Sequence, residues 1–504
     1  MKTDRWVTGR ALRAVTSDRA YGGPLPTQVS NGEETSYPFV ANYSKGLPHE
    51  LDGQVEPGAY RLLLRAVGTG LPDDFERIPL GSSVPTGGRR LTNPQAGLAF
   101  DVEGPDAQGL LLPAAPRIDG PQNSSEMAEL YWMALAHDVN FTDYASDPIV
   151  AAAAADLTNN FTDFRGPKVG GAVTPDTLFR GDTPGDLVGP YISQFLLTDI
   201  PYGTLTISQR QSTVAKGSND FLTIFSDWLD VQNGDDPNPN LPTETRYIQT
   251  ARDLATYVHF DALYEAYLNA CLILLGMNAP FDAGNPYNFS QNQMGFGTYG
   301  GPHILTLVTE VATRALKAVW FQKWFVHRRL RPEEFGGRIE AQRLGLAQFP
   351  MIDQEILNSP VLDDIFNQFG SHLLPQAFTE GSPTHPAYGS GHATVAGACV
   401  TILKAWFDES FVLPGPVLVP DVAGTALVPD PTSPPLTVGG ELNKVAANIG
   451  NARNMAGVHW RTDFTEPFKL GEAIAIGVLQ DQKQTANEDA TFTLTRFDGT
   501  TIAI

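Results

Sequence analysis

Hydrophobic positions recur at helical spacing through most of the second half of the chain. Between residues 245 and 277, apolar side chains such as Leu254 and Val258 lie three or four positions apart. This spacing places them on one face of an amphipathic helix. Similar runs predict further helices over 303–330, 390–408, 439–459 and 464–483. These elements are numerous enough to form helix bundles.

The first half of the chain has a weaker pattern and is rich in Pro and Gly. Segments 20–60 and 80–120 are therefore expected to be long ordered loops that wrap a core. A helix is predicted over 124–139, with Asn123 as its N-cap and Glu126 three positions later. Weaker helical patterns cover 147–158 and 185–198.

We expect one domain over residues 1–504, because no internal repeat or clear linker divides the chain. It comprises a loop-rich half (1–240), a helical half (241–490) and a short strand segment (491–504). Another short strand is predicted near 203–210, and the Pro-rich segment 410–438 is an excursion between two helices.

Charge narrows the range of partners. The chain has 34 Lys and Arg against 56 Asp and Glu, a net charge of −22. Such a protein repels nucleic acid and anionic membranes, so neither is expected as a partner. The N-terminal residues MKTDRWVTGRALRAVTSD lack the apolar core of a secretory signal, and no 18-residue apolar stretch predicts a transmembrane helix. We expect a soluble protein whose compartment the sequence does not define.

Against this acidic background, one segment is strongly basic. Five cationic or titratable side chains fall within nine positions at the end of the 303–330 helix: Lys323, His327, Arg328, Arg329 and Arg331. Pro332 is expected to stop that helix. Basic residues often end helices because they complement the helix dipole, so the segment alone indicates a function only weakly.

A second segment combines two histidines with a helix start. His385 precedes Ser390, Gly391 and His392, which open the predicted helix 390–408. The free backbone N–H groups of a helix N-terminus can bind an anion. The alternative is that Ser390 serves only as an N-cap.

A third segment contains Arg453, His459 and Asp463. Asp463 follows His459 by four residues, where a carboxylate can hold the second nitrogen of the imidazole if the helix continues. The alternative is an ordinary surface pair at i and i+4, which contributes a few tenths of a kcal/mol.

The order and spacing of the three segments resemble the vanadium haloperoxidase and type 2 phosphatidic acid phosphatase superfamily. The fuller segments QKWFVHRRLRPEEFGG, EGSPTHPAYGSGHATVAGACVTILKA and NMAGVHWRTD resemble the red-algal type of vanadium bromoperoxidase. The likeness extends over most of the chain, including GLAFDVEGPDAQ (97–108), residues 253–275, GGELNK (439–444) and the terminal FDGTTIAI. It implies a mainly all-α fold of two four-helix bundles with long ordered loops and a few short β-hairpins. It also implies a large homo-oligomer, with a dodecamer as one form.

The same resemblance implies an enzyme that uses vanadate (V⁵⁺) and no heme. Hydrogen peroxide would oxidise bromide or iodide to hypobromous acid or an equivalent, which brominates small organic nucleophiles. Vanadium would act as a Lewis acid without a change of oxidation state. His459 is the expected vanadium ligand, with its tautomer fixed by Asp463. The vanadate oxygens would be bound by Lys323, Arg331, Ser390, Gly391, His392 and Arg453.

Further roles follow from the resemblance. His392 is the expected general acid–base, and Lys323 would polarise bound peroxide. His385 matches the second histidine of the bromoperoxidase members, which favours bromide and iodide over chloride. Two roles are equally favoured for Trp320: packing in the core, or lining the halide pocket. Some relatives bind a structural divalent cation such as calcium, but the corresponding region 285–297 has no carboxylate and does not support one.

Two other functions fit the same residues. An acid phosphatase would use His459 as the nucleophile and His392 as the acid, because phosphate and vanadate have nearly the same shape. A non-catalytic shell protein would use Lys323, Arg331 and Arg453 to hold a structural anion. Bromide oxidation and phosphate-ester hydrolysis, each measured with and without vanadate, distinguish the three.

Overall fold

The computed structural model describes residues 2–81, 88–215, 219–237 and 241–504, and these are mainly helical with four small antiparallel hairpins. Residues 82–87 of the expected 80–120 loop lie outside this description. The α-helices are α1 (Lys2–Tyr21), α2 (Glu33–Ser36), α3 (Pro57–Thr69), α4 (Pro72–Phe75), α5 (Pro121–Leu135), α6 (Pro148–Asn159), α7 (Phe225–Gln232), α8 (Ala251–Phe260), α9 (Glu265–Gly276), α10 (Gly301–Phe321), α11 (Pro332–Arg343), α12 (Gln354–Leu357), α13 (Pro360–Phe369), α14 (Gly391–Trp406), α15 (Val438–Met455), α16 (Arg461–Thr465) and α17 (Pro467–Thr485).

Short 3₁₀ turns, one π-helical turn and the strands complete the list. The helical turns are η1 (Pro94–Leu98), η2 (Ala107–Gly109), η3 (Phe141–Asp143), η4 (Gln194–Leu196) and the π-helical η5 (Gln322–His327). The hairpins pair β1 (Ile200–Tyr202) with β2 (Leu205–Ile207), β3 (Gln211–Ala215) with β4 (Thr243–Arg246), β5 (Leu418–Pro420) with β6 (Leu427–Pro429), and β7 (Thr493–Thr495) with β8 (Thr501–Ala503). The strands expected near 203–210 and in 491–504 are therefore confirmed as hairpins.

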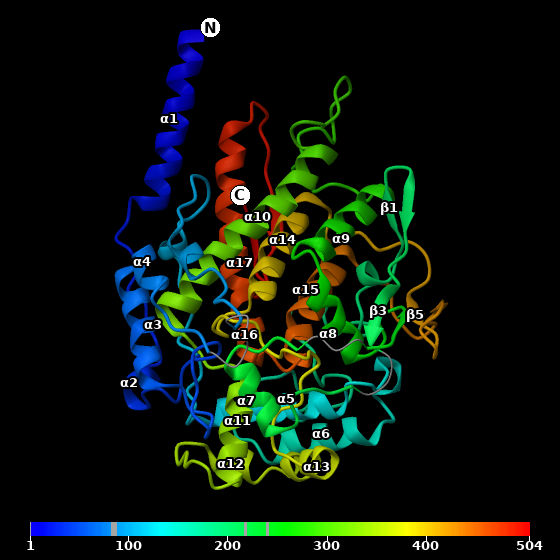
Figure 1. Cartoon of the computed structure of the whole chain (residues 1–504). Helices are drawn as coiled ribbons and strands as arrows, with labels where there is room; N and C mark the ends of the chain where they lie inside the picture. Colours follow the sequence, from blue (N-terminus) through cyan, green and yellow to red (C-terminus); the bar gives the residue numbers. More distant parts are fainter. Residues whose placement is uncertain (1, 82–87, 216–218, 238–240) are drawn as a thin grey trace.

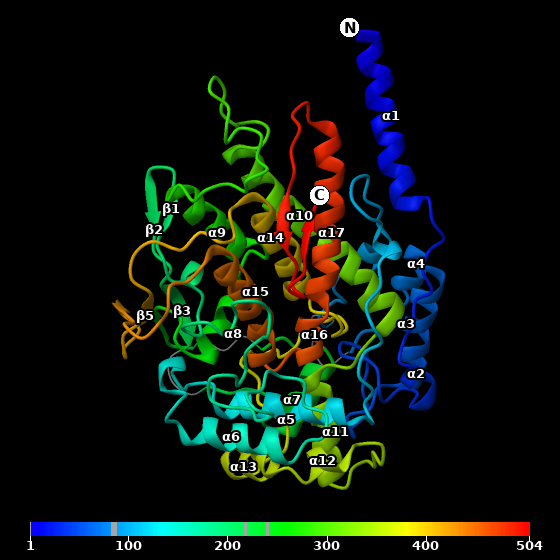
Figure 2. The same ribbon diagram turned by 180° about the vertical axis from the view of Figure 1, so that it is seen from behind.

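Helix α14 lies at the centre of the main bundle, where it packs against α10, α15 and α17 (Figure 1). Its composition explains this position, because it is apolar all round and almost every residue from Gly391 to Trp406 is buried. A second group of helices, α5, α6, α7 and α11 to α13, lies below this bundle (Figure 2). One large cluster of buried apolar side chains runs from Ala41 to Phe497 and joins the two groups.

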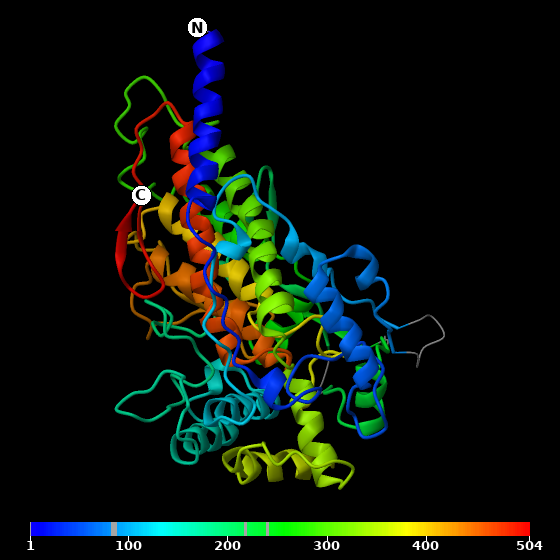
Figure 3. The same cartoon turned by 90° about the vertical axis from the view of Figure 1, so that its left-hand side faces the viewer.

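The chain from α2 to α4 lies along one side of the bundle (Figure 3). Helices α2 to α4 stack beside it, and α1 projects away from the body (Figure 3). The expected loop 20–60 thus includes a helix and the start of another, and the helical pattern of α1 was missed because its side chains are mostly polar and exposed. In the described residues, no single helix is long and apolar enough to cross a membrane. The pair α8 and α9 reaches that length only together, and a bend of 98° separates them.

Several boundaries differ from the sequence prediction for identifiable reasons. The helix expected over 124–139 begins instead at Pro121, since Pro is favoured at the first helical position, and Gly120 rather than Asn123 is its N-cap. The predicted helix 185–198 is wrong apart from the short η4. Gly185 and Gly189 adopt positive φ there, and α15 side chains bind the backbone: Asn448 accepts from the Ser193 N–H and Glu441 from that of Gln194.

Three predicted helices are interrupted at positions that matter for the site. The run 245–277 is broken between α8 and α9, and 464–483 is split by Pro467 at the start of α17. The helix expected over 303–330 is α10, which continues into the π-helical turn η5. The helical path stops at Arg328, whose φ is 40°. Pro332 therefore does not stop that helix but begins α11.

Candidate functional site

The three basic or histidine-containing segments meet beside the N-terminus of α14. His385, Gly391, His392, Arg453 and His459 line one cavity of about 380 Å³. Lys323 and Arg331 lie directly behind its wall and are fully buried. These residues are separated by up to 136 positions in the sequence, so the fold alone brings them together.

His459 lies in the turn between α15 and α16, not on a helix as the sequence pattern suggested. Helix α15 ends at Met455, and Gly457 turns the chain with a φ of 80°. A Cβ at this glycine would lie 2.6 Å from the Gln376 amide nitrogen, so the close approach also requires Gly. The predicted contact with Asp463 is nevertheless present: the distance from His459 Nδ1 to Asp463 Oδ2 is 2.8 Å.

This hydrogen bond defines the chemistry of the imidazole. Burial, reinforced by Arg331 and Lys323, lowers the pKa of His459 well below its ordinary value, so the ring is neutral. Since Nδ1 donates its proton to Asp463, Nε2 is unprotonated, and in this structure its lone pair accepts from Arg331. Arg331 Nη1 lies 2.9 Å from Nε2. A neutral imidazole nitrogen of this kind has the chemistry needed to coordinate a metal ion.

Asp463 is itself held by a second partner that sequence reasoning missed. Its Oδ1 accepts from Arg329 at 2.9 Å, and Arg329 also contacts Glu126 at 3.2 Å. Asp463 is the third residue of α16 and accepts from the Trp460 backbone N–H at 3.1 Å. Burial raises the pKa of Asp463, while Arg329 opposes that shift. No local spacing indicates this pair, because 134 positions separate Arg329 from Asp463.

Three buried cations surround the histidine. Lys323 Nζ donates to the carbonyls of Pro386 and Ala387 at 2.9 and 3.0 Å. Arg331 donates to the Val458 carbonyl, and Arg453 to that of Val258. Within the described part of the chain, none of the three forms an ion pair with a carboxylate, and Arg453 Nε has no hydrogen-bond partner. We call this group, with His459, the cationic cup.

The cup is electrostatically unusual for a protein interior. Burial together with the Arg331 charge lowers the pKa of Lys323 well below its ordinary value. Burial lowers the pKa of Arg331 and of Arg453 to about 10. Elsewhere in the core, Arg252, Arg329 and Arg461 each pair with carboxylates. Buried charges normally have such partners, so the cup fits a multiply charged oxyanion.

Ser390 and Gly391 start α14 as expected. The Ser390 hydroxyl accepts from the Ala393 N–H at 3.4 Å, so Ser390 is the N-cap, and its own N–H donates to the Asp463 carbonyl. A Cβ on Gly391 would lie 3.2 Å from the Trp320 ring. The start of α14 therefore directs its N-terminal dipole toward the cavity with little space to spare.

His392 has a carboxylate partner that the sequence did not indicate. Its Nε2 lies 3.1 Å from Asp261 Oδ1. Although burial alone would raise the pKa of Asp261, His392 lowers it below the ordinary value. Asp261 lies in the break between α8 and α9, so the bend that interrupts the predicted helix 245–277 positions this carboxylate.

His385 and Trp320 also line the cavity. His385 Nδ1 lies 2.9 Å from Arg331 Nη2, and its ring lies 4.8 Å from that of Trp320 between centroids. Burial and the nearby Lys323 lower the pKa of His385 well below its ordinary value. Trp320 lines the cavity and donates to the Thr92 carbonyl at 3.0 Å. His259 and Glu380, 2.7 Å apart, also line it and were not predicted.

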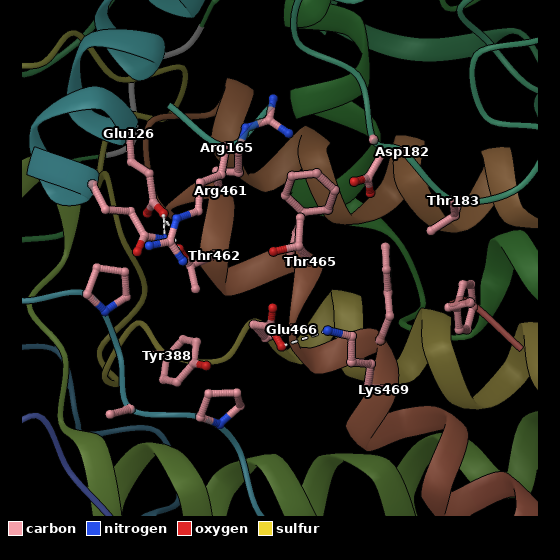
Figure 4. A pocket seen from close by; sticks show the side chains of 18 residues that line it. Glu126, Arg165, Asp182, Thr183, Tyr388, Arg461, Thr462, Thr465, Glu466 and Lys469 are labelled. Atoms are coloured by element: carbon pink, nitrogen blue, oxygen red, sulfur yellow. Dashed lines mark hydrogen bonds and ion pairs between the residues drawn. The ribbon is translucent and has the colours of Figure 1, made fainter. Parts of the chain in front are cut away.

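A second cavity of about 250 Å³ lies near the other end of the Arg329 network (Figure 4). Glu126, Tyr388 and Thr462 are among its lining residues, and Glu126 accepts from the Thr462 hydroxyl. Its cations are paired with carboxylates: Lys469 with Glu466, Arg461 with Glu129, and Arg165 with Asp163. This cavity therefore lacks the uncompensated positive charge of the cup. No group of three or more His, Cys, Asp or Glu in the described ranges is arranged to hold a metal ion.

Comparisons with known proteins identify the class of the fold. A family model described as the VCPO second helical-bundle domain matches residues 367–488, which include the start of α14 and His459. The chain is similar to the solved structure of a homohexameric vanadate-dependent bromoperoxidase from Ascophyllum nodosum. The two have a TM-score of 0.92 and 29% sequence identity, and the match covers 100% of this chain and 90% of that one. The fold is that of the vanadium haloperoxidases.

Curated sequences narrow the assignment. The vanadium-dependent bromoperoxidase of Corallina officinalis is 40% identical over 96% of this chain and 95% of its own length. That of Ascophyllum nodosum is 36% identical over 95% of this chain and 88% of its own. The chain belongs to the family of vanadium-dependent bromoperoxidases. The family resemblance drawn from the sequence is confirmed.

Proposed function

We propose that this protein catalyses the vanadate-dependent oxidation of bromide, and of iodide, by hydrogen peroxide. The observation that carries the proposal is the cationic cup, in which Lys323, Arg331 and Arg453 are buried without carboxylate partners beside the unprotonated Nε2 of His459. Membership of a family whose curated members are named vanadium-dependent bromoperoxidases supports the same conclusion.

In this proposal His459 is the only vanadium ligand, and Asp463 keeps its Nε2 unprotonated. Arg331 and Arg453 would each bind oxyanion oxygens through the guanidinium fork, while Lys323 supplies a point charge. The oxygen contacts are completed by Ser390, Gly391 and His392. When bound, vanadate supplies Lewis acidity that activates peroxide toward a halide.

The overall reaction consumes a proton. Bromide, hydrogen peroxide and one proton give hypobromous acid and water: the Br–O bond forms as the O–O bond breaks, bromide gives up two electrons to peroxide, and the leaving hydroxide takes up the proton to become water. His392 lines the cavity and is partly exposed, with Asp261 behind it. We assign His392 as the residue that exchanges this proton with solvent, and Asp261 as the residue that orients its ring.

His385 and Trp320 are proposed to set halide preference. The His385 ring lies between Arg331 and Trp320, so it places a neutral imidazole against the cup. Trp320 contributes an aromatic face 5.6 Å from Lys323 Nζ, measured to the ring centroid. Small organic nucleophiles would react with the oxidised halogen in the cavity or in solution.

We also propose a homo-oligomer, because the structural relative from Ascophyllum nodosum is described as homohexameric. The dodecamer implied by the sequence resemblance stays a prediction, as does the division into residues 1–240, 241–490 and 491–504. A structural calcium ion is not proposed.

The decisive experiment titrates the metal-free protein with orthovanadate and follows bromination of monochlorodimedone with bromide and peroxide. We expect activity to rise with vanadate to a plateau, and His459→Ala to remove it. Hydrolysis of p-nitrophenyl phosphate is measured in parallel. Phosphatase activity without any vanadate-dependent bromination would assign the cup to phosphate esters. The absence of both activities would identify an anion-binding shell protein.

A further inference from the structure

A buried histidine outside the cup joins the lower helix group to the end of α15. Helix α5 lies below α15 (Figures 1 and 2), and His137 directly follows the C-cap of α5. His137 is 1% exposed. Its Nδ1 lies 2.7 Å from Asp220 Oδ1, and its Nε2 lies 2.6 Å from the Met455 carbonyl oxygen. The proposed reaction does not use His137, but Met455 ends α15 only four residues before His459.

Both ring nitrogens of His137 face acceptors, so the ring carries two protons. A carbonyl oxygen can only accept a hydrogen bond. Although burial alone would raise the pKa of Asp220, His137 and Arg252 lower it below its ordinary value, so Asp220 is ionised. Arg252 Nη2 lies 3.1 Å from Asp220, and Arg252 Nε lies 2.7 Å from Asp138, so two cations face two carboxylates. A neutral ring would direct a lone pair at one of its two oxygen partners.

The turn that leads to His459 is held through four successive carbonyl groups. His137 holds the first, which belongs to Met455. The other three accept from separate segments: Ala456 from the Ala377 N–H at 3.3 Å, Gly457 from the Gln376 amide at 3.1 Å, and Val458 from Arg331 at 2.7 Å. The bond from His137 is stronger than a neutral one because its donor is charged. It also lies at the C-terminus of α15, where the helix dipole attracts a cation.

We propose that His137 is a positioning residue for vanadate binding, because its imidazolium fixes the end of α15 and thereby the turn that presents His459 to the cup. Without an N–H at this point, the buried Met455 carbonyl would lack a donor, and the turn would have to shift to find one. The inference rests on the proposed function, since it names a support of the expected vanadium ligand.

The test compares two uncharged substitutions that keep different nitrogens. The amide nitrogen of His137→Asn falls near the position of Nδ1 and can reach Asp220, whereas that of His137→Gln falls near Nε2 and can reach Met455. Isothermal titration calorimetry of the metal-free full chain with orthovanadate measures the affinity. We expect it to fall by about tenfold or more in the Asn variant, and to stay within about threefold of wild type in the Gln variant. A role in the Asp220 cluster alone would give the opposite order.

Hydrogen exchange, followed by mass spectrometry without vanadate, reads the turn directly. The amides of residues 456–460 should exchange about tenfold faster or more in His137→Asn, while those of α17 keep their wild-type rates. The matched control is His372→Asn, because the His372 Nδ1 also lies near a carboxylate, 3.0 Å from Glu340 Oε2. It should leave both the exchange of the turn and the vanadate affinity unchanged.

Equal vanadate affinity in the two His137 variants, or a higher affinity in the Asn variant, would overturn this inference. Wild-type exchange of residues 456–460 in the Asn variant would do the same. Faster exchange throughout α17 as well would show that His137 supports the fold in general, which also contradicts a positioning role. If wild type binds no vanadate but only the turn of the Asn variant exchanges faster, the positioning of the turn stands and the proposed function fails.

Discussion

Asp463 divides its two carboxylate oxygens between His459 and Arg329, so one side chain couples the expected vanadium ligand to a buried ion network. Asp463→Asn keeps the size of the side chain but can present an N–H to His459 Nδ1, which favours the wrong tautomer. We expect vanadate affinity to fall by about 10- to 100-fold, the range typical of changes behind a metal ligand. Isothermal titration calorimetry on the metal-free protein measures it.

Asp261→Asn is the matched control, because it changes a carboxylate behind His392 instead of His459. Its vanadate affinity should stay within about threefold of wild type, a difference below 1 kcal/mol. The pH dependence of kcat should change, because His392 would lose the partner that orients it. If both asparagine variants lose vanadate equally, Asp463 has no special role in holding His459.

His327 makes folding stability depend on pH. Burial, together with Arg328 and Arg329, lowers the pKa of His327 to about 3. Below its ordinary value of 6.5 the unfolded chain takes up a proton that the folded protein excludes, so the free energy of unfolding falls as pH decreases. The slope is at most about 1.4 kcal/mol per pH unit for this residue.

His327→Phe should make that dependence shallower while it keeps the aromatic contact with Tyr388. Urea denaturation at about pH 7 and about pH 5.5 measures the difference, which we expect to be roughly 1 kcal/mol smaller in the variant. Identical pH slopes for the two proteins would show that the folded state accepts the proton. His49, whose pKa burial also lowers to about 3, is unchanged in both proteins and contributes equally.

The sequence predicted the four residues of the cup and the two histidines beside it, but not the residues that support them. Lys323, Arg331, His385, His392, Arg453 and His459 were predicted because the order and spacing of their three segments resemble the vanadium haloperoxidase family. Asp261 and Arg329 act across 131 and 134 positions, and no local spacing relates them to their partners. Their roles depend on tertiary packing, which periodicity does not encode.

Among the elements, α14 and α17 approach each other closely through glycines. A Cβ on Gly471 would lie 2.0 Å from the Thr394 carbonyl oxygen, and one on Gly397 would lie 2.3 Å from that of Phe468. Gly471→Ala must therefore separate the two helices, at a cost of about 1–3 kcal/mol. Because α14 begins at the cavity, bromination should fall as well, and chemical denaturation measures the stability change.

The matched substitution is Gly68→Ala in α3, where a Cβ would meet nothing within 4 Å. It should be neutral or stabilise the protein by about 0.5–1 kcal/mol, since Ala reduces the freedom of the unfolded chain. If the two substitutions changed the free energy of unfolding equally, the close contact between α14 and α17 would not control the stability of the protein.

The predicted helices were correct where an apolar face packs against the bundle and wrong where buried side chains replace helical hydrogen bonds. The run over 390–408 matches α14 closely. The run over 185–198 has helical spacing, but its backbone is held by Asn448 and Glu441 of α15 instead. Hydrophobic spacing therefore predicts which residues are buried. It predicts less reliably whether those residues form a helix.

At the scale of the whole molecule, charge has opposite signs at the surface and in the cup. The −22 net charge is carried by a chain that also buries Lys323, Arg331 and Arg453 near one cavity. The amino-acid composition gives the sign of the net charge. It does not show that cations gather in the cup, because 34 Lys and Arg side chains can be distributed over a fold in many ways. The segment spacing, not the total charge, predicted the oxyanion site.

Repulsion among the three cations of the cup makes the metal-free protein receptive to any tetrahedral anion. Orthovanadate at a hundred times its Kd should stabilise the fold by about 2.7 kcal/mol, visible as a higher Tm in calorimetry. Inorganic phosphate should raise Tm in the same way, whereas chloride at equal ionic strength should not. Protein purified in phosphate buffer should then have a higher Tm but recover bromination more slowly when vanadate is added. Phosphate and vanadate compete for the same cationic cup.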